Sequence, residues 1–234
     1  MTQKTTSLDK PLVRSSAVAR FWDSTLGKKV VMAVTGVIMI AFLIAHVLGN
    51  FAIFQGPEAL NAYSAFLHGQ AAGLLWLVRI VLVLSLFFHV LAASQLMSIS
   101  RGARQKGYAR QNHRAATLAS LSMRLSGLLI AAFIVFHILH LSTGSIQPVP
   151  FDAPNVYANV VGGFRVPWVA GLYLVSMLFV GLHVFHGAFA YFRTLGLRRR
   201  SNRSLSKPIA VVVAVFVWLG FTIIPLAVMT NRVQ

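Results

Sequence analysis

The stretch TGVIMIAFLIAH, residues 35–46, returns in outline as SGLLIAAFIVFH, residues 126–137. Each copy opens with a hydroxyl residue and a glycine, contains an Ala-Phe pair, and ends in a histidine ten residues after the glycine. Everything between is apolar, as in a helix that crosses a membrane. Because an imidazole in hydrocarbon costs free energy, two such histidines in equivalent places predict a shared functional role.

Composition places the whole chain in a membrane. Of 234 residues, 57% are hydrophobic and 11% are charged, and the mean hydropathy is +0.73. Apolar runs long enough to cross the hydrocarbon, which takes roughly 20 helical residues, cover about 30–54, 71–97, 116–142, 166–191 and 208–230. We therefore predict an all-α bundle of five transmembrane helices. The bundle forms one domain over residues 30–230, between an N-terminal tail (1–29) and a short C-terminal tail (231–234).

Basic residues predict the orientation of these helices. Lys and Arg gather in the N-terminal tail, in residues 101–114 and in residues 198–207. The positive-inside rule then predicts a cytoplasmic N-terminus and an outer C-terminus. Topology and anionic lipid headgroups account for the net charge of +17, so we expect no nucleic-acid partner. The chain has no cysteine, which excludes disulfides and thiolate metal ligands.

Four histidines fall at two depths. At about 1.5 Å per residue, His46 and His137 lie roughly 6–14 Å below the outer membrane boundary, and His89 and His183 lie roughly 24–27 Å below it. We name His46 and His137 the outer pair, and His89 and His183 the inner pair. Two imidazoles at one depth can ligate a haem iron from both sides. The pairs therefore predict metal ligands for two haems b.

Two of these histidines belong to doublets. The glycine-to-histidine spacing of the repeat favours His137 over His140, which lies three residues further along the same helix face. The residues around His89 recur around His183, which favours His183 over His186. His140 and His186 then become candidates for the haem pocket or for contacts with a haem propionate.

Other readings of buried histidines exist. A single histidine in a membrane helix can serve as a hydrogen-bonding residue between helices. A proton relay is the other functional reading, but relays usually include acidic residues. The four acidic residues of this chain all lie outside the predicted spans: Asp9, Asp23, Glu58 and Asp152.

Six short motifs spread along nearly the whole chain carry a resemblance to a known family. They are Leu26-Gly27-Lys28-Lys29, His46-Val47-Leu48-Gly49-Asn50, Asn61-Ala62-Tyr63, Arg124-Leu125-Ser126-Gly127, His183-Val184-Phe185-His186-Gly187 and Thr194-Leu195-Gly196. With these motifs the chain resembles the five-helix, two-haem cytochrome b anchors of succinate dehydrogenase and fumarate reductase. The resemblance implies that the outer and inner pairs hold one haem each, and it again selects His183, four residues before the motif glycine.

The same resemblance implies a function in electron transfer. A flavoprotein and an iron–sulfur protein would dock on the cytoplasmic face and oxidise succinate there. This chain would anchor them in a bacterial cytoplasmic membrane and pass their electrons through the haems to menaquinone or ubiquinone. Succinate would be oxidised on a partner chain, whereas the quinone site would lie on this chain.

Candidate residues for the quinone and the haem propionates are less narrowly determined. Ser120 and Arg124 look like the quinone-site Ser and Arg of related anchor subunits. A hydroxyl and a guanidinium can donate hydrogen bonds to a quinone carbonyl and polarise it. The alternative is that Arg124 pairs with an inner haem propionate or extends to the interface. Arg79, about 9 Å from the outer boundary, is favoured as an outer propionate partner. An outer quinone pocket near Glu58, His68 and His140 stays open.

One departure from the family affects the expected direction of reaction. Some fumarate reductases of this family carry a glutamate two residues before the fourth-helix ligand, where it moves protons, and this chain has Gly181 there. We therefore expect no proton path through that position, and succinate oxidation rather than fumarate reduction. Two rival functions remain: a cytochrome b of a hydrogenase or formate dehydrogenase, and a haem-free membrane transporter.

Overall fold

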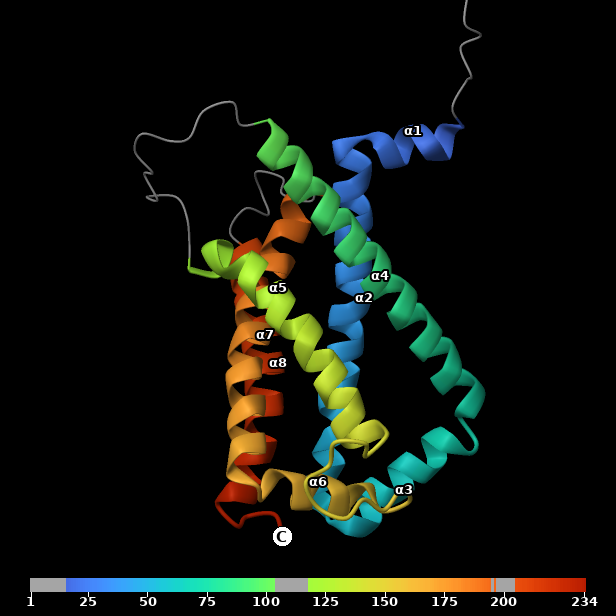
Figure 1. Cartoon of the computed structure of the whole chain (residues 1–234), viewed down its shortest axis with the longest axis vertical. Helices are drawn as coiled ribbons and strands as arrows, with labels where there is room; N and C mark the ends of the chain where they lie inside the picture. The colour runs from blue at the N-terminus through green and yellow to red at the C-terminus, as the bar shows by residue number, and fades with distance from the viewer. Residues whose placement is uncertain (1–15, 104–117, 195, 197–204) are drawn as a thin grey trace, which may run out of the picture.

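Five long apolar helices form the body of this all-α computed structural model (Figure 1). They are α2 (Thr25–Asn50), α4 (Ala72–Gly102), α5 (Leu118–His137), α7 (Pro167–Thr194) and α8 (Ser206–Met229). The structure describes residues 16–103, 118–194, 196 and 205–234, without the side chains of 118–121. All five helices are long and apolar enough to span a membrane. The predicted multi-pass, five-span architecture is therefore confirmed.

Shorter segments lie at the two ends of the bundle. Helix α1 (Ala17–Asp23) crosses the start of α2 at a steep angle, and α3 (Pro57–His68) and α6 (Val156–Phe164) lie at the opposite end with the C-terminus (Figure 1). A 3-10 turn, η1 (Phe51–Gln55), extends α2, and a π-helical turn, η3 (Ile138–Ser142), extends α5. Helices α3 and α6 lie between the predicted spans, where the sequence predicts no helix.

Local sequence signals explain where α3, α6 and α7 begin. Gly56 has a positive φ of 102°, which glycine adopts without steric cost, and Pro57 follows it in the first turn of α3. The Asn155 side chain accepts a hydrogen bond from the backbone N–H of Ala158 and so caps α6. Helix α7 begins at Pro167, as the sequence predicts.

The helices pack as two pairs joined in the middle. Helix α4 packs mainly on α2, α5 packs on α7, and α2 and α7 pack on each other. Helices α4 and α5 slant in the same direction across the view, and α8 lies behind α7, its closest partner (Figure 1). The buried middle of the bundle contains Met177, Val180 and Val184 of α7 with Ala214 and Val217 of α8. Helix α7 is therefore the central element.

A polar cap closes the end of the bundle that holds α3 and α6. Asn61 donates to the Asn155 side chain at 3.0 Å and accepts from the backbone N–H of Tyr157 at 3.0 Å, which joins α3 to α6. The Tyr157 hydroxyl donates to the backbone oxygen of Gln234 at 2.9 Å. Asn159, 2% exposed, ties α6 to the preceding loop through the backbone of Asp152. These bonds fix the ends of α2, α5 and α7 relative to one another.

Most of the charges that predict the orientation lie outside the described residues. This applies to residues 1–15, to 104–117 and to 197–204. The names outer pair and inner pair keep the meaning that the predicted orientation gives them: the outer pair lies toward α3 and α6, and the inner pair toward α1.

Gly220 should be required for the contact of α8 with α2. A Cβ at this position would lie 2.4 Å from Cγ1 of the fully buried Val47, whereas a Cβ on Gly171 of α7 would meet no atom within 4 Å. We expect Gly220→Ala to destabilise the protein by about 1–3 kcal/mol through overpacking. Gly171→Ala should leave stability unchanged or slightly raised. Thermal unfolding in detergent measures both, and equal midpoints would contradict the packing described here.

Candidate functional site

The outer pair brings together the two histidines that end the repeated motif. His46 projects from α2 and His137 from α5, and their ring centroids lie 6.0 Å apart with an interplanar angle of 82°. The His46 ring stacks on Phe42, one turn earlier in α2, at 5.2 Å. Phe221 of α8 contacts the same ring at 5.5 Å. Two histidines separated by 91 positions in the sequence thus share one apolar environment.

The inner pair repeats this arrangement on the other two helices. His89 projects from α4 and His183 from α7, with ring centroids 6.3 Å apart and an interplanar angle of 55°. Four helices therefore contribute one imidazole each, and the imidazoles meet in two pairs. The structure brings together the same partners that the depth estimate paired.

Both ring-centroid separations match the distance expected for two imidazoles that bind one metal ion from opposite sides. Each metal–nitrogen bond is about 2 Å long and each ring nitrogen stands about 1 Å from its ring centre, so two rings that ligate one ion have centres about 6 Å apart. Within the described part of the chain, no three metal-ligating side chains converge. Each pair can therefore supply two ligands and no more. A haem iron, whose porphyrin occupies the other four positions, needs only two from the protein.

Hydrogen bonds fix which nitrogen of His89 carries the proton. Its Nδ1 lies 3.1 Å from the backbone oxygen of Met32 on α2. Because a carbonyl oxygen only accepts, this nitrogen carries the hydrogen and Nε2 presents a lone pair. Thr35 Oγ1 lies 3.2 Å from the same nitrogen and donates its own hydrogen to the Val31 carbonyl at 2.8 Å. The threonine oxygen is then a second acceptor for His89.

Ser126 holds His183 in the equivalent way. Its Oγ donates to the Met123 carbonyl at 3.2 Å and lies 3.3 Å from His183 Nδ1. Thr35 and Ser126 are the first residues of the two copies of the repeated motif. Each copy therefore serves both levels: its final histidine belongs to the outer pair, and its opening hydroxyl orients a histidine of the inner pair.

The motif glycines lie against the inner pair as well. A Cβ on Gly36 would lie 3.4 Å from His89 Cε1, and one on Gly127 would lie 3.7 Å from His183 Cε1. A side chain larger than Ala at either position would push on the imidazole. Gly187, one turn after His183, has no atom within 4 Å of its Cβ position, so space is open beside that ring.

The second histidine of each doublet takes a different place from the paired one. His140 is fully buried, and its Nδ1 lies 3.0 Å from the Tyr173 hydroxyl. The same hydroxyl lies 3.1 Å from Nδ1 of His137, which is the doublet member that faces His46. His186 is half-buried one turn from His183, toward the α1 end.

The two arginines predicted to bind a propionate or a quinone, Arg79 and Arg124, are both exposed. Arg79 is exposed on α4, where it donates to His68 Nε2 at 3.4 Å and lies 5.1 Å from the Trp76 ring centre. Arg124 is exposed near the start of α5. The side chain of Ser120 lies outside the described residues. The roles predicted for these three residues remain predictions.

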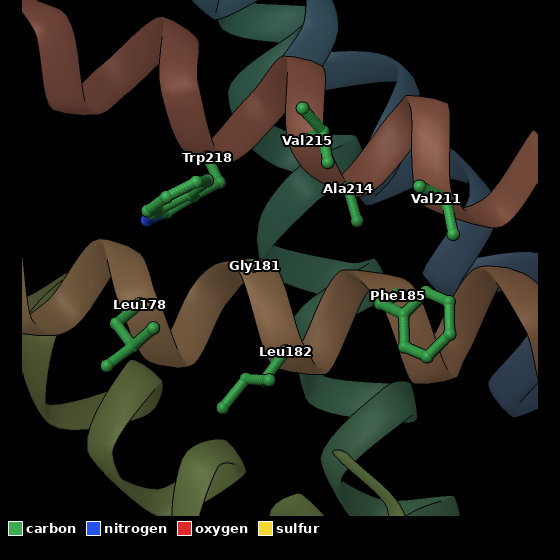
Figure 2. Close-up of a pocket in the computed structure, with 8 residues that line it drawn as sticks. All are labelled: Leu178, Gly181, Leu182, Phe185, Val211, Ala214, Val215 and Trp218. Atoms are coloured by element: carbon green, nitrogen blue, oxygen red, sulfur yellow. The ribbon is translucent and has the colours of Figure 1, made fainter. Parts of the chain in front are cut away.

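Gly181 lies where α7 meets α8. A Cβ there would fall 3.1 Å from Cβ of Trp218, so a longer side chain would have to displace the tryptophan. Figure 2 shows this contact beside an apolar groove between the two helices, with Leu178 and Leu182 on α7 and Val215 on α8. Packing against α8 thus explains the small residue at position 181.

Two residues that touch the outer pair escaped the sequence analysis. Phe221 contacts His46 from α8, and Tyr173 joins His137 to His140. Depth counting would have found the tyrosine, because it lies seven residues into the predicted span 166–191, at the estimated level of the outer pair. No sequence signal marks Phe221, since aromatic residues are common in apolar helices.

Comparisons with known proteins add no further identification. No protein-family model, no curated protein and no solved structure matches this chain. What the sequence and the fold establish is a five-helix membrane protein whose four central histidines meet in two pairs.

Proposed function

We propose that this chain is a di-haem cytochrome b that anchors a succinate dehydrogenase and passes its electrons to a membrane quinone. The observation that carries the haem assignment is the meeting of four imidazoles, from four helices, in two pairs with centroid separations of 6.0 and 6.3 Å. The assignment of the partner enzyme rests on the family resemblance of the six motifs.

The chemistry of the donor set supports haem over other metal groups. Neutral imidazole suits iron and brings no charge into hydrocarbon, and the chain has no cysteine for an iron–sulfur cluster. The acidic residues described by the structure, Asp23, Glu58 and Asp152, lie outside the five long helices. A hard cation such as Mg²⁺ would therefore find no carboxylate ligand beside either pair.

Haem, when bound, supplies one-electron transfer at a potential that its axial ligands and their hydrogen bonds tune. The protein's part is to hold each ligand ring. The Met32 carbonyl and Thr35 keep the proton of His89 on Nδ1, and Ser126 does the same for His183. Such bonds orient a ligand ring and raise its basicity. Phe42 and Phe221 pack on His46 and keep water from it.

The partner chains would dock at the α1 end. In the predicted orientation this end is cytoplasmic and carries three basic segments. Lys28, only 6% exposed, anchors α1 to α2 by donating to the Trp22 carbonyl at 2.6 Å. A flavoprotein and an iron–sulfur protein placed there would deliver electrons first to the inner pair.

The quinone site is proposed on the residues that the resemblance selects. Arg124, exposed near the α1 end of α5, can reach a quinone in the surrounding lipid, and Ser120 lies one turn before it. Pairing of Arg124 with an inner propionate is the competing role. Arg79 keeps its proposed role as an outer propionate partner, for which His68 would have to release it.

Purification of the chain with its associated proteins tests the function as a whole. We expect two haems b per chain by pyridine haemochrome, co-purification with a flavoprotein, and reduction of the haems by succinate. Reduction by hydrogen or formate in place of succinate would assign the chain to a different dehydrogenase. A preparation without a Soret band would overturn the haem assignment and favour the transporter.

Removal of one imidazole should remove one haem. We expect His46→Ala to abolish the outer haem and His89→Ala the inner one, because each iron loses one of its two protein ligands. Each variant should retain one haem per chain by haemochrome assay, with a low-spin EPR signal that differs between the variants. His68→Ala, an exposed histidine on α3, is the matched control and should keep two. Two haems in either paired-histidine variant would refute the ligand assignment.

The hydroxyl of Thr35 should affect the midpoint potential of the inner haem and not that of the outer haem. In Thr35→Val, His89 loses one of two acceptors, so its ring donates less electron density and the inner midpoint potential rises. A hydrogen bond of about 1 kcal/mol corresponds to roughly 40 mV for one electron, which sets the upper size of the shift. Thr230→Val removes an exposed hydroxyl that also donates to the carbonyl four residues earlier, and should change neither potential. Redox titration followed optically measures both variants.

A further inference from the structure

A chain of polar side chains leads away from the outer pair toward the polar cap. The Tyr173 hydroxyl on α7 lies between two imidazoles of α5, 3.1 Å from His137 Nδ1 and 3.0 Å from His140 Nδ1. One hydroxyl has a single hydrogen, so it can donate to only one of these nitrogens and must accept from any nitrogen that carries a proton. The direction of this bond decides which nitrogen of His137 carries a lone pair.

The far end of the chain fixes that direction. Gln147 Nε2 lies 2.8 Å from the backbone oxygen of Asn159, which only accepts, so the amide nitrogen is the donor and Oε1 is left free. Among the described residues, this Oε1 is buried without a partner, and so is Nε2 of His140. No hydrogen bond joins the two side chains in this structure, but they are neighbours. Both groups also lie beside Gly163, whose Cβ position is 2.8 Å from His140 Nε2 and 3.4 Å from Gln147 Nε2.

Joining these two orphaned atoms satisfies both. A buried polar atom without a partner has lost its water without compensation, so a hydrogen bond from His140 Nε2–H to Gln147 Oε1 is favoured. His140 is neutral in this apolar site and has only one N–H, so its Nδ1 must accept. The Tyr173 hydroxyl then donates to His140, and its oxygen accepts from Nδ1–H of His137. Nε2 of His137 is left with a bare lone pair.

We propose that Tyr173, His140 and Gln147 form an outer hydrogen-bond chain that keeps the proton of His137 on Nδ1 and leaves its Nε2 free to bind metal opposite His46. His140 is a positioning residue in this scheme and not a ligand. The metal in question is the outer haem iron, so the inference rests on the proposed function. The donor-to-acceptor direction of these hydrogen bonds, however, follows from the Asn159 carbonyl and does not depend on a metal.

The two pairs are thus held by different devices. The inner pair uses the opening hydroxyls of the repeated motif, Thr35 and Ser126. The outer pair uses α7 and the loop that follows η3, which end at the polar cap. The outer chain therefore links the environment of one haem to the end of the bundle away from the succinate-oxidising partners.

Tyr173→Phe in the purified chain with its bound haems tests the link. The ring packing of Tyr173 on Phe133 and Phe164, at 5.0 and 4.8 Å, is kept, and only the hydroxyl is lost. We expect two haems per chain, a raised midpoint potential for the outer haem and an unchanged inner one, because an acceptor on Nδ1–H makes the imidazole a stronger donor to iron. Tyr157→Phe, whose hydroxyl donates to Gln234 in the cap, is the matched control and should move neither potential.

His140→Phe separates positioning from ligation. The phenyl ring fills the same buried space and keeps the stack on Phe136. A positioning role predicts two retained haems with an outer potential shifted as in Tyr173→Phe, whereas a ligand role predicts loss of the outer haem. Loss of the haem, or an unmoved outer potential in Tyr173→Phe, would overturn the outer hydrogen-bond chain alone. A wild-type chain without haem would overturn the proposed function itself, so the two failures are distinguishable.

Discussion

A polar group in the hydrocarbon of a membrane must find its partner within the protein, and the histidine pairs depend on this constraint. Three of the four paired imidazoles have Nδ1 within hydrogen-bond distance of an oxygen from a neighbouring helix. With no water to take its place, each such oxygen orients its ring. The partner of His89 is a carbonyl oxygen, which only accepts, so the proton of that ring lies on Nδ1 and Nε2 keeps a free lone pair. A ring in this state can bind a metal without losing a proton.

The repeated motif gives the bundle an internal equivalence. Helices α2 and α5 carry the two copies, and each packs against an antiparallel helix that provides the inner histidine: α4 for α2, and α7 for α5. The hydroxyl-to-histidine distance along the chain is 54 residues in one half and 57 in the other. Each half therefore holds one histidine of each pair, and neither pair forms unless the halves meet through α2 and α7.

Elements without a paired histidine complete the site from outside. Helix α8 packs Phe221 on His46 and Trp218 over Gly181, and its Gly220 permits the close approach to Val47. The cap built from α3, α6 and the following segments holds Gln147 in the one amide orientation that leaves Oε1 free. Residues at the periphery of the bundle thus affect the central histidine rings through a few specific contacts.

Sequence alone determined the class of structure and the identity of the pairs. Five apolar runs predict five spans because hydrocarbon thickness sets helix length. Counting residues at a fixed helical rise placed His46 level with His137, and His89 level with His183. Those inferences succeed because both depend on distances along a helix, which the chain's covalent geometry and hydrogen bonding fix in advance.

Only the tertiary structure decided what surrounds each ring. The histidine rings are contacted from other helices by Tyr173, Phe221 and the Met32 carbonyl. The rotation and crossing of the helices place these groups there, and no local pattern in the sequence indicates either. The short helices α3 and α6 form where the sequence predicts no membrane span. The amide contact between Asn61 and Asn155 that joins them is long-range and leaves no local pattern in the sequence. Depth is a property of one helix, whereas the environment of an imidazole is a property of several packed together.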